Sequence, residues 1–337
     1  MQMKNAKTLT IFFMETGMAE SKKNFCISRF KGVEQREYEV EIITPLFLGG
    51  ADPQKAELRI PSIKGALRFW WRALYGSDDL KDMKKRESEI FGSTEKKAGF
   101  DIRVCKITDC YPKLADLPKG EKFTVKTKGK QFKLGIIDYL AFGLRDFRKG
   151  YSKEYIPNKN KFKILFYYRN QDYKLEIENS FKTLVFHGGL GAKTRNGFGS
   201  LYVKDLKPVG KIGKELKKFS SFSCETILFK QFQKLDSWVD SLSELGMVYR
   251  DARLSVEPKH QYRKRLLIAK PIVQTGDTGS RHAKPYFLHV NKLADGKYQG
   301  QILFMPYQYY EPVRRKEYFE TCNRINKKII QLSGGTR

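Results

Sequence analysis

A glycine-rich stretch, residues 186–202 (FHGGLGAKTRNGFGSLY), constrains the fold of this chain more than any other feature. It follows a segment with helical periodicity, 175–186, and precedes a short apolar segment, 200–204, which has the character of a strand. Five glycines fall within twelve residues of it: Gly188, Gly189, Gly191, Gly197 and Gly199. Glycine readily adopts a positive φ and lets another molecule approach the main chain closely. The stretch is therefore predicted to be a loop between a helix and a strand that can lie against a ligand.

Polar and basic side chains stand between these glycines. They are Lys193, Thr194, Arg195 and Asn196. Two cations in such a loop suit a phosphate backbone. The loop matches neither standard nucleotide motif, because Ala192 interrupts the Gly-Lys-Ser/Thr order of a P-loop and a dinucleotide fingerprint opens a helix, not a strand. A surface loop without a ligand remains the alternative.

The charge of the chain favours a polyanionic partner. Sixty-five Lys and Arg against 37 Asp and Glu give a formal net charge of +28 and an isoelectric point near 9.7. An excess of this size, spread along the whole sequence, is typical of nucleic-acid binding. A membrane-surface protein usually concentrates its charge on one amphipathic helix, and thermophile proteins usually gain Glu together with Lys. The expected partner is therefore nucleic acid and not a membrane.

Length and composition favour a globular, two-domain protein of the cytoplasm. The 337 residues exceed one ordinary domain, and 40% hydrophobic with 13% aromatic content excludes wholesale disorder. No apolar run approaches the roughly 20 residues that span a bilayer, and the N-terminus does not resemble a secretory signal. The cysteines are odd in number and scattered, which predicts buried free thiols in a reducing cytoplasm. They are Cys26, Cys105, Cys110, Cys224 and Cys322.

The elements predicted for the first half follow the order β-α-β-β-α-β. The strands are 37–43, 100–106, 162–168 and 200–204, and the helices are 63–75 and 175–186. This is the order of the ferredoxin-like unit that RNA-recognition modules share. We assign it to a domain at 37–206, preceded by an N-terminal extension, 1–36. An insertion around 109–160 is predicted to hold a hairpin, 123–134, and a short helix, 136–147.

The second half shows a related order. Residues 207–222 have the composition of a linker, and a second domain is predicted at 223–337. Its expected elements are a helix through Leu228, Phe232, Leu235, Val239 and Leu242, strands at 266–273, 285–291 and 299–306, and a closing helix at 318–332. The whole chain is thus predicted to be an α+β protein with tandem ferredoxin-like (RRM-like) domains and insertions.

The helix predicted at 63–75 has two different faces. Ser62 is its expected N-cap, because a serine hydroxyl can accept from a free amide of the first turn. Trp70 and Trp71 belong to an apolar stripe that we interpret as core. Three cations follow one another along the flank: Lys64, Arg68 and Arg72. They favour either phosphate binding near the helix N-terminus or a merely solvated basic face.

The strand predicted at 37–43 has an acidic outer face, made by Glu37, Glu39 and Glu41. Strict alternation with apolar residues predicts that the strand is half buried. Its acidic face is either solvated or a docking surface for a basic neighbour.

Two phrases, ITPLFLGGADPQKAELRIPSIKGALRFWWRAL (43–74) and GGLGAKTRNGFGSL (188–201), closely resemble the RAMP superfamily of CRISPR proteins. Within it, the chain is most similar to the first-numbered Cmr subunits of type III-B RNA-guided effector complexes, to which the SIKGALRFWWR block is specific. The glycine loop is general to the superfamily. The resemblance covers most of residues 37–205.

The resemblance implies a tandem ferredoxin-like protein that requires no metal or cofactor. Such a subunit binds RNA without cutting it, near the 3′ end of the guide RNA in a complex with other Cmr subunits, and helps to engage target RNA in antiviral defence. The expected RNA-binding residues combine the helix cations with the glycine loop. They are Lys64, Arg68, Arg72, Gly188, Gly189, Gly191, Lys193, Thr194, Arg195, Asn196 and Gly197.

An enzyme is the alternative. CRISPR repeat-processing endoribonucleases share the glycine loop and often use a histidine as general acid/base. Of the four histidines only His187 adjoins the loop, and a histidine at a helix end is more often structural. The sequence contains no HExxH motif, no CxxC pair and no acidic cluster resembling a two-metal nuclease. A metal-independent endoribonuclease that uses His187 stays open, as does a purely structural subunit.

Overall fold

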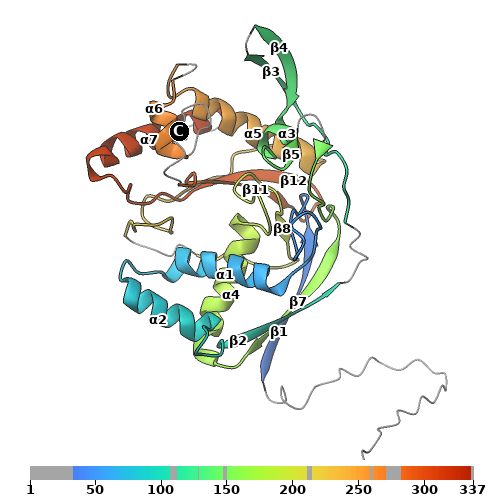
Figure 1. Cartoon of the computed structure of the whole chain (residues 1–337), viewed down its shortest axis with the longest axis vertical. Helices are drawn as coiled ribbons and strands as arrows, with labels where there is room; N and C mark the ends of the chain where they lie inside the picture. Colours follow the sequence, from blue (N-terminus) through green and yellow to red (C-terminus); the bar gives the residue numbers. More distant parts are fainter. Residues whose placement is uncertain are drawn as a thin grey trace, which may run out of the picture. The chain divides into compact units, whose positions relative to one another are not determined.

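The computed structural model describes residues 33–106, 112–127, 129–146, 150–210, 215–258, 261–270 and 282–334. The chain divides into two units, Met1–Val33 and Glu34–Arg337, and the fold described below is that of the second unit. The predicted extension, 1–36, therefore lies almost entirely outside the described residues. Helices and strands mix in this unit (Figure 1), which confirms the α+β class.

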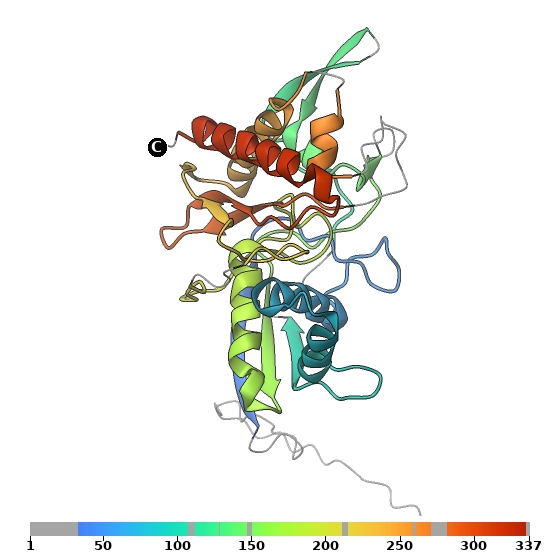
Figure 2. The ribbon, with the colours of Figure 1, turned by 90° about the vertical axis from the view of Figure 1, so that its left-hand side faces the viewer.

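The first sheet has four antiparallel strands in the order β2-β7-β1-β8. The strands are β1 (Glu34–Ile42), β2 (Phe100–Lys106), β7 (Lys161–Tyr168) and β8 (Leu201–Tyr202). The helices beside it are α1 (Ile60–Tyr75), α2 (Leu80–Phe91) and α4 (Lys174–His187). Taken in chain order, the first and third strands lie at the centre of the sheet, as the predicted β-α-β-β-α-β order requires. Figure 2 shows α4 running along the strands, with α1 and α2 beside it.

The core of this half depends on the aromatic stripe of α1. Trp70 and Trp71 are both buried, as predicted. Trp71 Nε1 donates a hydrogen bond of 2.7 Å to Glu176 of α4, so the buried indole N–H keeps a partner. Truncating a buried aromatic of this size costs about 3–5 kcal/mol.

The acidic face of β1 is paired within the chain. Glu39 contacts Lys161 at 2.8 Å, and Glu41 accepts a hydrogen bond of 2.8 Å from Lys292, a residue of the second half. Glu37 and Lys163 form a third pair at 2.5 Å. The acidic face therefore docks basic residues of this same chain.

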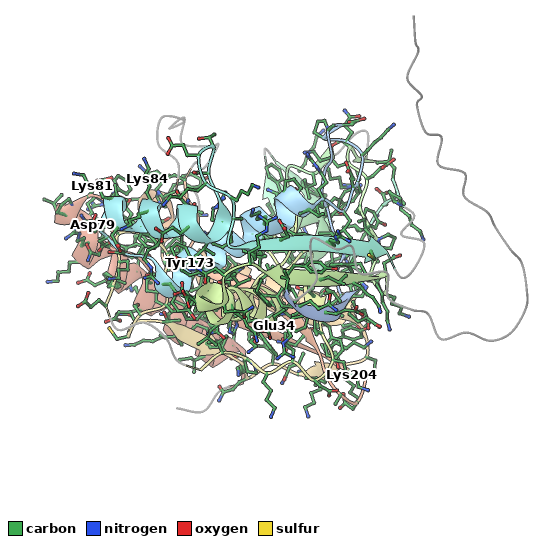
Figure 3. The ribbon with its side chains drawn as sticks, turned by 90° about the horizontal axis from the view of Figure 1, so that it is seen from below. Glu34, Asp79, Lys81, Lys84, Tyr173 and Lys204 are labelled. Carbon is green, nitrogen blue, oxygen red and sulfur yellow. The ribbon has the colours of Figure 1, made fainter. Side chains whose placement is uncertain are left out.

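Helix α2 is positioned by a side-chain cap. The Asp79 carboxylate accepts from the amides of Lys81 (2.9 Å) and Asp82 (3.3 Å), which satisfies two donors of the first turn. Lys81 and Lys84 are exposed at the outer edge of the helix (Figure 3). Its inner side carries Glu87, which faces α1.

The second half has its own antiparallel sheet, in which β12 is central. Its strands are β9 (Ile227–Phe229), β10 (Lys234–Leu235), β11 (Tyr286–Lys292) and β12 (Tyr298–Phe304). Its helices are α5 (Trp238–Leu254), α6 (Arg263–Ile268) and α7 (Arg315–Leu332), the last preceded by a 3-10 turn, Pro312–Arg314. Within the described residues no strand follows α7, so the second ferredoxin-like unit is not completed there.

Two predicted elements of the second half are wrong. The helix predicted through Leu228 and Leu235 begins only at Trp238, because the segment before it pairs with β12 in two short strands. The Ser237 side chain caps the helix by accepting from the amide of Asp240 at 3.1 Å.

The strand predicted at 266–273 is also wrong, because its first residues belong to helix α6. Residues 271–273 of the predicted strand lie outside the described part. The Glu257 carboxylate accepts from two amides at the start of α6, at 2.8 and 2.9 Å.

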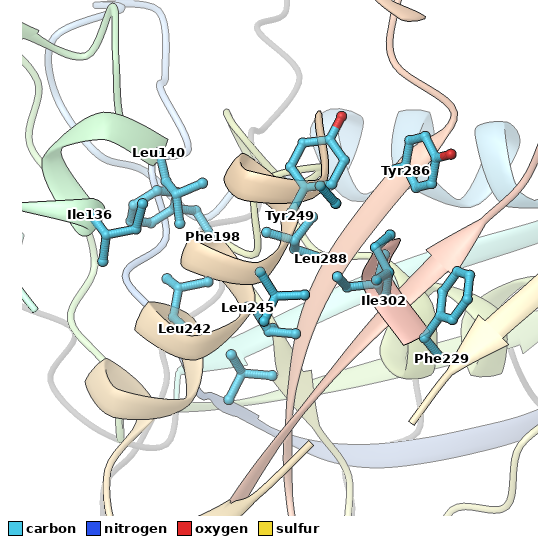
Figure 4. Packing of buried hydrophobic residues seen from close by; sticks show 14 of the residues in the cluster. Ile136, Leu140, Phe198, Phe229, Leu242, Leu245, Tyr249, Tyr286, Leu288 and Ile302 are labelled. Carbon is cyan, nitrogen blue, oxygen red and sulfur yellow. The ribbon is translucent and has the colours of Figure 1, made fainter. Parts of the chain in front are cut away.

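The insertion packs on the second half. It contains the predicted hairpin, β3 (Lys122–Thr127) with β4 (Lys130–Gly135), then α3 (Ile136–Leu140), β5 (Arg145–Asp146) and β6 (Gly150–Tyr151). Helix α3 ends at Leu140, earlier than the predicted end at 147. A Cβ on Gly246 of α5 would lie 2.7 Å from Ile136 and 2.9 Å from Leu140, so the two helices are in close contact. Figure 4 shows this junction, with Leu242 and Leu245 of α5 beside Leu288 and Ile302 of the sheet.

The two halves are joined by more than the predicted linker, 207–222. Phe287, Leu303 and Met305 of the second half belong to the same hydrophobic cluster as Trp70. Within the linker, Phe222 donates a main-chain hydrogen bond of 2.9 Å to Ala73 of α1. The division into domains at 37–206 and 223–337 remains a prediction, within one compact unit.

Candidate nucleic-acid interface

A cavity of about 580 Å³ lies where the glycine loop meets α1 and β11. Three groups of residues line it: a turn with the segment facing it, one face of α1, and the loop with Phe287. They are Phe47, Leu48, Gly49, Gly50, Pro53, Lys153 and Glu154; Ser62, Ala66, Phe69 and Trp70; and Gly188, Gly189, Gly191, Ala192, Thr194, Arg195 and Phe287. Aromatic walls with few polar groups are typical of a ligand site, and the volume lies in the usual range for one.

The glycines of the loop are required by the chain itself. Gly191 has φ +84°, and a Cβ there would lie 2.3 Å from the carbonyl oxygen of Phe47. A Cβ on Gly188 would lie 2.4 Å from Nε1 of Trp70. At these positions the chain's own atoms fill the side on which a Cβ would lie. Gly188, Gly189 and Gly191 nevertheless line the cavity.

Arg195 connects the loop to the second half. Its guanidinium lies 4.3 Å from the centre of the Phe287 ring and 5.7 Å from that of Phe69, within the range of cation–π contacts. One of its nitrogens, Nη1, donates a hydrogen bond to the carbonyl of Lys284. Burial lowers the pKa of Arg195 to about 10, which still leaves it charged at neutral pH. The structure thus places one predicted cation at the wall of the cavity.

The remaining loop residues have different positions. Thr194 lines the cavity, whereas Lys193, Asn196 and Gly197 do not. The Asn196 side-chain amide donates a hydrogen bond of 2.6 Å to the carbonyl of Leu140, which ties the loop to α3. Asn196 therefore positions the loop in this structure. Burial lowers the pKa of Lys193.

The cations of α1 lie apart from the glycine loop. Arg68 and Arg72 stand on the flank that faces α2, and Lys64 contacts the Phe100 ring of β2. The cavity is lined by Ser62 and Ala66, on another face of the same helix. Glu87 of α2 contacts Arg72 at 2.5 Å and Arg68 at 3.0 Å. The structure therefore does not bring the two groups of predicted RNA-binding residues together.

The start of α1 differs from the prediction. The helix begins at Ile60, and Ser62 lies within its first turn. Pro61 occupies that turn, where its missing N–H costs nothing and its fixed φ suits a helix. Lys64 is half buried and lies 5.5 Å from the centre of the Phe100 ring. Burial, followed by repulsion from Arg68, lowers the pKa of Lys64.

The histidine singled out for catalysis is half buried. His187 is absent from the cavity lining, and its Nδ1 accepts a hydrogen bond of 3.1 Å from the Gln301 side chain. Burial lowers the pKa of His187 to about 3, so the ring is neutral at physiological pH. His260, another of the four histidines, lies outside the described residues.

Sequence reasoning missed four contributors to the site. Phe69 and Phe287 hold Arg195, and Lys153 lines the cavity from the insertion. His289 donates from Nδ1 to the carbonyl of Gly188 at 2.8 Å. No local pattern marks these residues, because they meet only after the two halves pack. The RFWWR phrase around Phe69 was the one available signal.

The cysteines, possible metal sites and membrane spans can be characterised for the described part of the chain. Cys105, Cys224 and Cys322 are free thiols there, but only Cys322 is buried, so the expected burial is wrong for the other two. Among the described residues, no three His, Cys, Asp or Glu side chains gather as a metal site. None of the helices in that part combines the length and the apolar character needed to cross a membrane.

Comparison with known proteins supports the resemblance seen in the sequence. Residues 39–204 match the RAMP superfamily. The chain is 29% identical over 186 residues to the CRISPR system Cmr subunit Cmr1-2 of Pyrococcus furiosus, covering 50% of this chain and 95% of that protein. It is 28% identical over 215 residues to Cmr1-1 of the same organism, covering 62% of this chain and 56% of that protein.

A solved structure has a similar fold. The crystal structure of Cmr1 from Pyrococcus furiosus in its apo form matches 81% of this chain and 88% of its own, with a TM-score of 0.56 and 20% identity. The shared fold extends the likeness beyond the matched region into the second half. On these matches, residues 39–204 form a RAMP-superfamily region, and the Cmr1 subunits of Pyrococcus furiosus are relatives of this chain.

Proposed function

We propose that this chain is a non-catalytic RNA-binding subunit of a type III-B Cmr effector complex. It binds guide RNA near its 3′ end and helps to engage target RNA, together with other Cmr subunits. Its curated relatives are Cmr subunits, and its net charge of +28 suits a polyanionic ligand. The same proposal takes residues 223–337 as a second ferredoxin-like domain.

The position of Arg195 carries the proposal. It brings a charged guanidinium to the wall of a cavity that is also lined by Trp70 and Phe287. Single-stranded RNA is bound by this combination, in which bases stack on aromatic side chains and cations neutralise phosphates. The cavity therefore suits an unstacked nucleotide better than a purely apolar ligand.

The geometry gives less support to an endoribonuclease. A general acid/base must reach the proton that it transfers, and an effective one has a pKa near the working pH. His187 lies outside the cavity lining and has a pKa lowered by burial to about 3. Gln301 already occupies its Nδ1.

The test is a salt titration of RNA binding by the full chain, with RNA length followed in the same samples. If about six phosphates are contacted, log K falls with log[salt] at a slope of roughly −4, taking about −0.7 for each phosphate of a single strand. Unchanged RNA length, with or without divalent metal, supports a binder. Cleavage that disappears in His187→Gln would favour the endoribonuclease, and a slope near zero would favour a structural subunit.

A further inference from the structure

Four basic side chains from three separate segments form a cluster that includes Arg195 at the cavity wall. They are Lys193 and Arg195 of the glycine loop, Arg253 near the end of α5, and Lys284 just before β11. Arg195 donates to the main chain of Lys284, and the Lys284 ammonium lies 4.2 Å from the centre of the Tyr249 ring, one helical turn before Arg253. Lys284 is close enough to the other three to be repelled by each of them.

No carboxylate balances this cluster in the described part of the chain. The partners of Arg195, Arg253 and Lys284 there are neutral: the carbonyl of Lys284, the hydroxyl of Tyr139, and the rings of Phe69, Phe287 and Tyr249. The Nε atom of Arg253 is buried without any hydrogen-bond partner. Buried polar groups are normally satisfied, so this donor has hydrogen-bonding capacity left for a water molecule or a bound anion.

Two other half-buried cations of the described chain are paired with carboxylates, unlike the four of the cluster. Arg265 contacts Glu257 at 3.0 Å, and Lys292 contacts Glu41 at 2.8 Å. In the cluster, burial and repulsion from Arg253, Arg195 and Lys193 lower the pKa of Lys284 well below its ordinary value. Like charges held together away from water repel strongly, and a bound anion would relieve that repulsion.

We propose that Lys193, Arg195, Arg253 and Lys284 form a phosphate site for the backbone of a single-stranded RNA whose neighbouring base enters the cavity. This inference rests on the proposed function and adds to it two residues of the second half, Arg253 and Lys284. RNA is favoured over an acidic protein segment because Arg195 belongs to both the cluster and the cavity wall. A nucleotide uses both features at once, whereas a carboxylate side chain has no need of an aromatic cavity.

The test compares Lys284→Gln with Lys204→Gln, a matched loss of charge at an exposed lysine beyond β8 (Figure 3). Two quantities are measured for each: the urea midpoint of unfolding without RNA, and the affinity for a labelled oligouridylate. Lys284→Gln should raise the midpoint, because it removes a repelled cation. It should also weaken RNA binding by roughly tenfold, as expected for the loss of one charge-assisted contact. The salt slope should become shallower by about 0.7.

The control variant and the possible outcomes distinguish a failure of this inference from a failure of the proposed function. Lys204→Gln should leave the midpoint unchanged and the affinity within about twofold, as for an exposed charge. Arg253→Gln provides a second affinity measurement if Lys284→Gln does not fold. Wild-type protein that binds no RNA at low salt removes the proposed function together with this site. If wild-type protein binds RNA and both variants bind it as tightly as Lys204→Gln does, the site is overturned while the proposed function stands. The site is also overturned if polyglutamate displaces the RNA as effectively as unlabelled oligouridylate does.

Discussion

His289 of β11 donates a 2.8 Å hydrogen bond from Nδ1 to the carbonyl of Gly188, the first glycine of the loop. The strand that begins just after Lys284 thus holds the loop that carries Arg195. His289 is fully buried, and the glycine loop owes its position to a residue a hundred positions further along the chain.

This buried histidine makes stability depend on pH. Burial lowers the pKa of His289 to about 4, below its ordinary value of 6.5. Between these values the unfolded chain takes up a proton that the folded protein does not, so stability is lost as the pH falls from 6.5 towards 4. His289→Asn retains an amide donor and does not titrate. Across this window, urea unfolding should show wild-type protein losing up to about 3 kcal/mol more than the variant. Equal losses would show that His289 does not carry the dependence.

The close fit of the glycine loop predicts a specific loss of stability. Gly191→Ala combines a positive φ with a contact to the Phe47 carbonyl and should destabilise the protein by about 2–4 kcal/mol. Gly296→Ala is the matched control, because its φ is +81° but nothing lies within 4 Å of the added Cβ. The control should cost only about 1 kcal/mol in denaturant unfolding. Similar losses in both variants would mean that the loop can relax away from Phe47.

The basic flank of α1 can be tested through its acidic neighbour. Glu87→Gln removes the carboxylate shared by Arg68 and Arg72, which frees two guanidinium groups for phosphate. If RNA lies along this flank, the affinity should rise several-fold, while Glu95→Gln at an exposed position should change it little. If Glu87→Gln binds RNA with the same affinity as the wild-type protein, the cations of α1 do not contact RNA.

The aromatic stripe of the same helix is predicted to act on stability. Trp71→Ala should lower the free energy of unfolding by about 3–5 kcal/mol, since it empties a fully buried site and leaves Glu176 with only its contact to Arg86. The triple replacement of Lys64, Arg68 and Arg72 by Ala should leave the protein folded and weaken its RNA binding. A triple variant that unfolds beside a stable Trp71→Ala would reverse this assignment of faces.

Local patterns in the sequence were sufficient for much of the fold. The alternation along β1 and the helical stripe through Trp70 and Trp71 were both predicted correctly. Each pattern reflects only which side chains of one element face the core. The spacing of Leu228 and Leu235 suited a helix, yet pairing with β12 turned their segment into strands. Tertiary contacts of that kind cannot be recognised from the local sequence pattern.

The site was less predictable than the fold. Lys193 and Arg195 stood out because glycines surround them, but the partner that occupies the α1 cations, Glu87, lies on a different helix. Arg253 and Lys284 join the loop only when the two halves pack, and neither belongs to a recognisable motif. A residue whose role depends on such packing cannot be found from spacing alone.

The most direct measurement for the central claim is to map where RNA contacts this chain. A 4-thiouridine-labelled oligonucleotide would be crosslinked to the full-length protein, and the linked peptides identified by mass spectrometry. The account predicts crosslinks at the cavity, on peptides that contain Phe69 and Trp70 or Phe287, and their loss when Arg195 and Lys193 are both changed to Gln. Crosslinks confined to surfaces away from the cavity, and unchanged in that double variant, would contradict it.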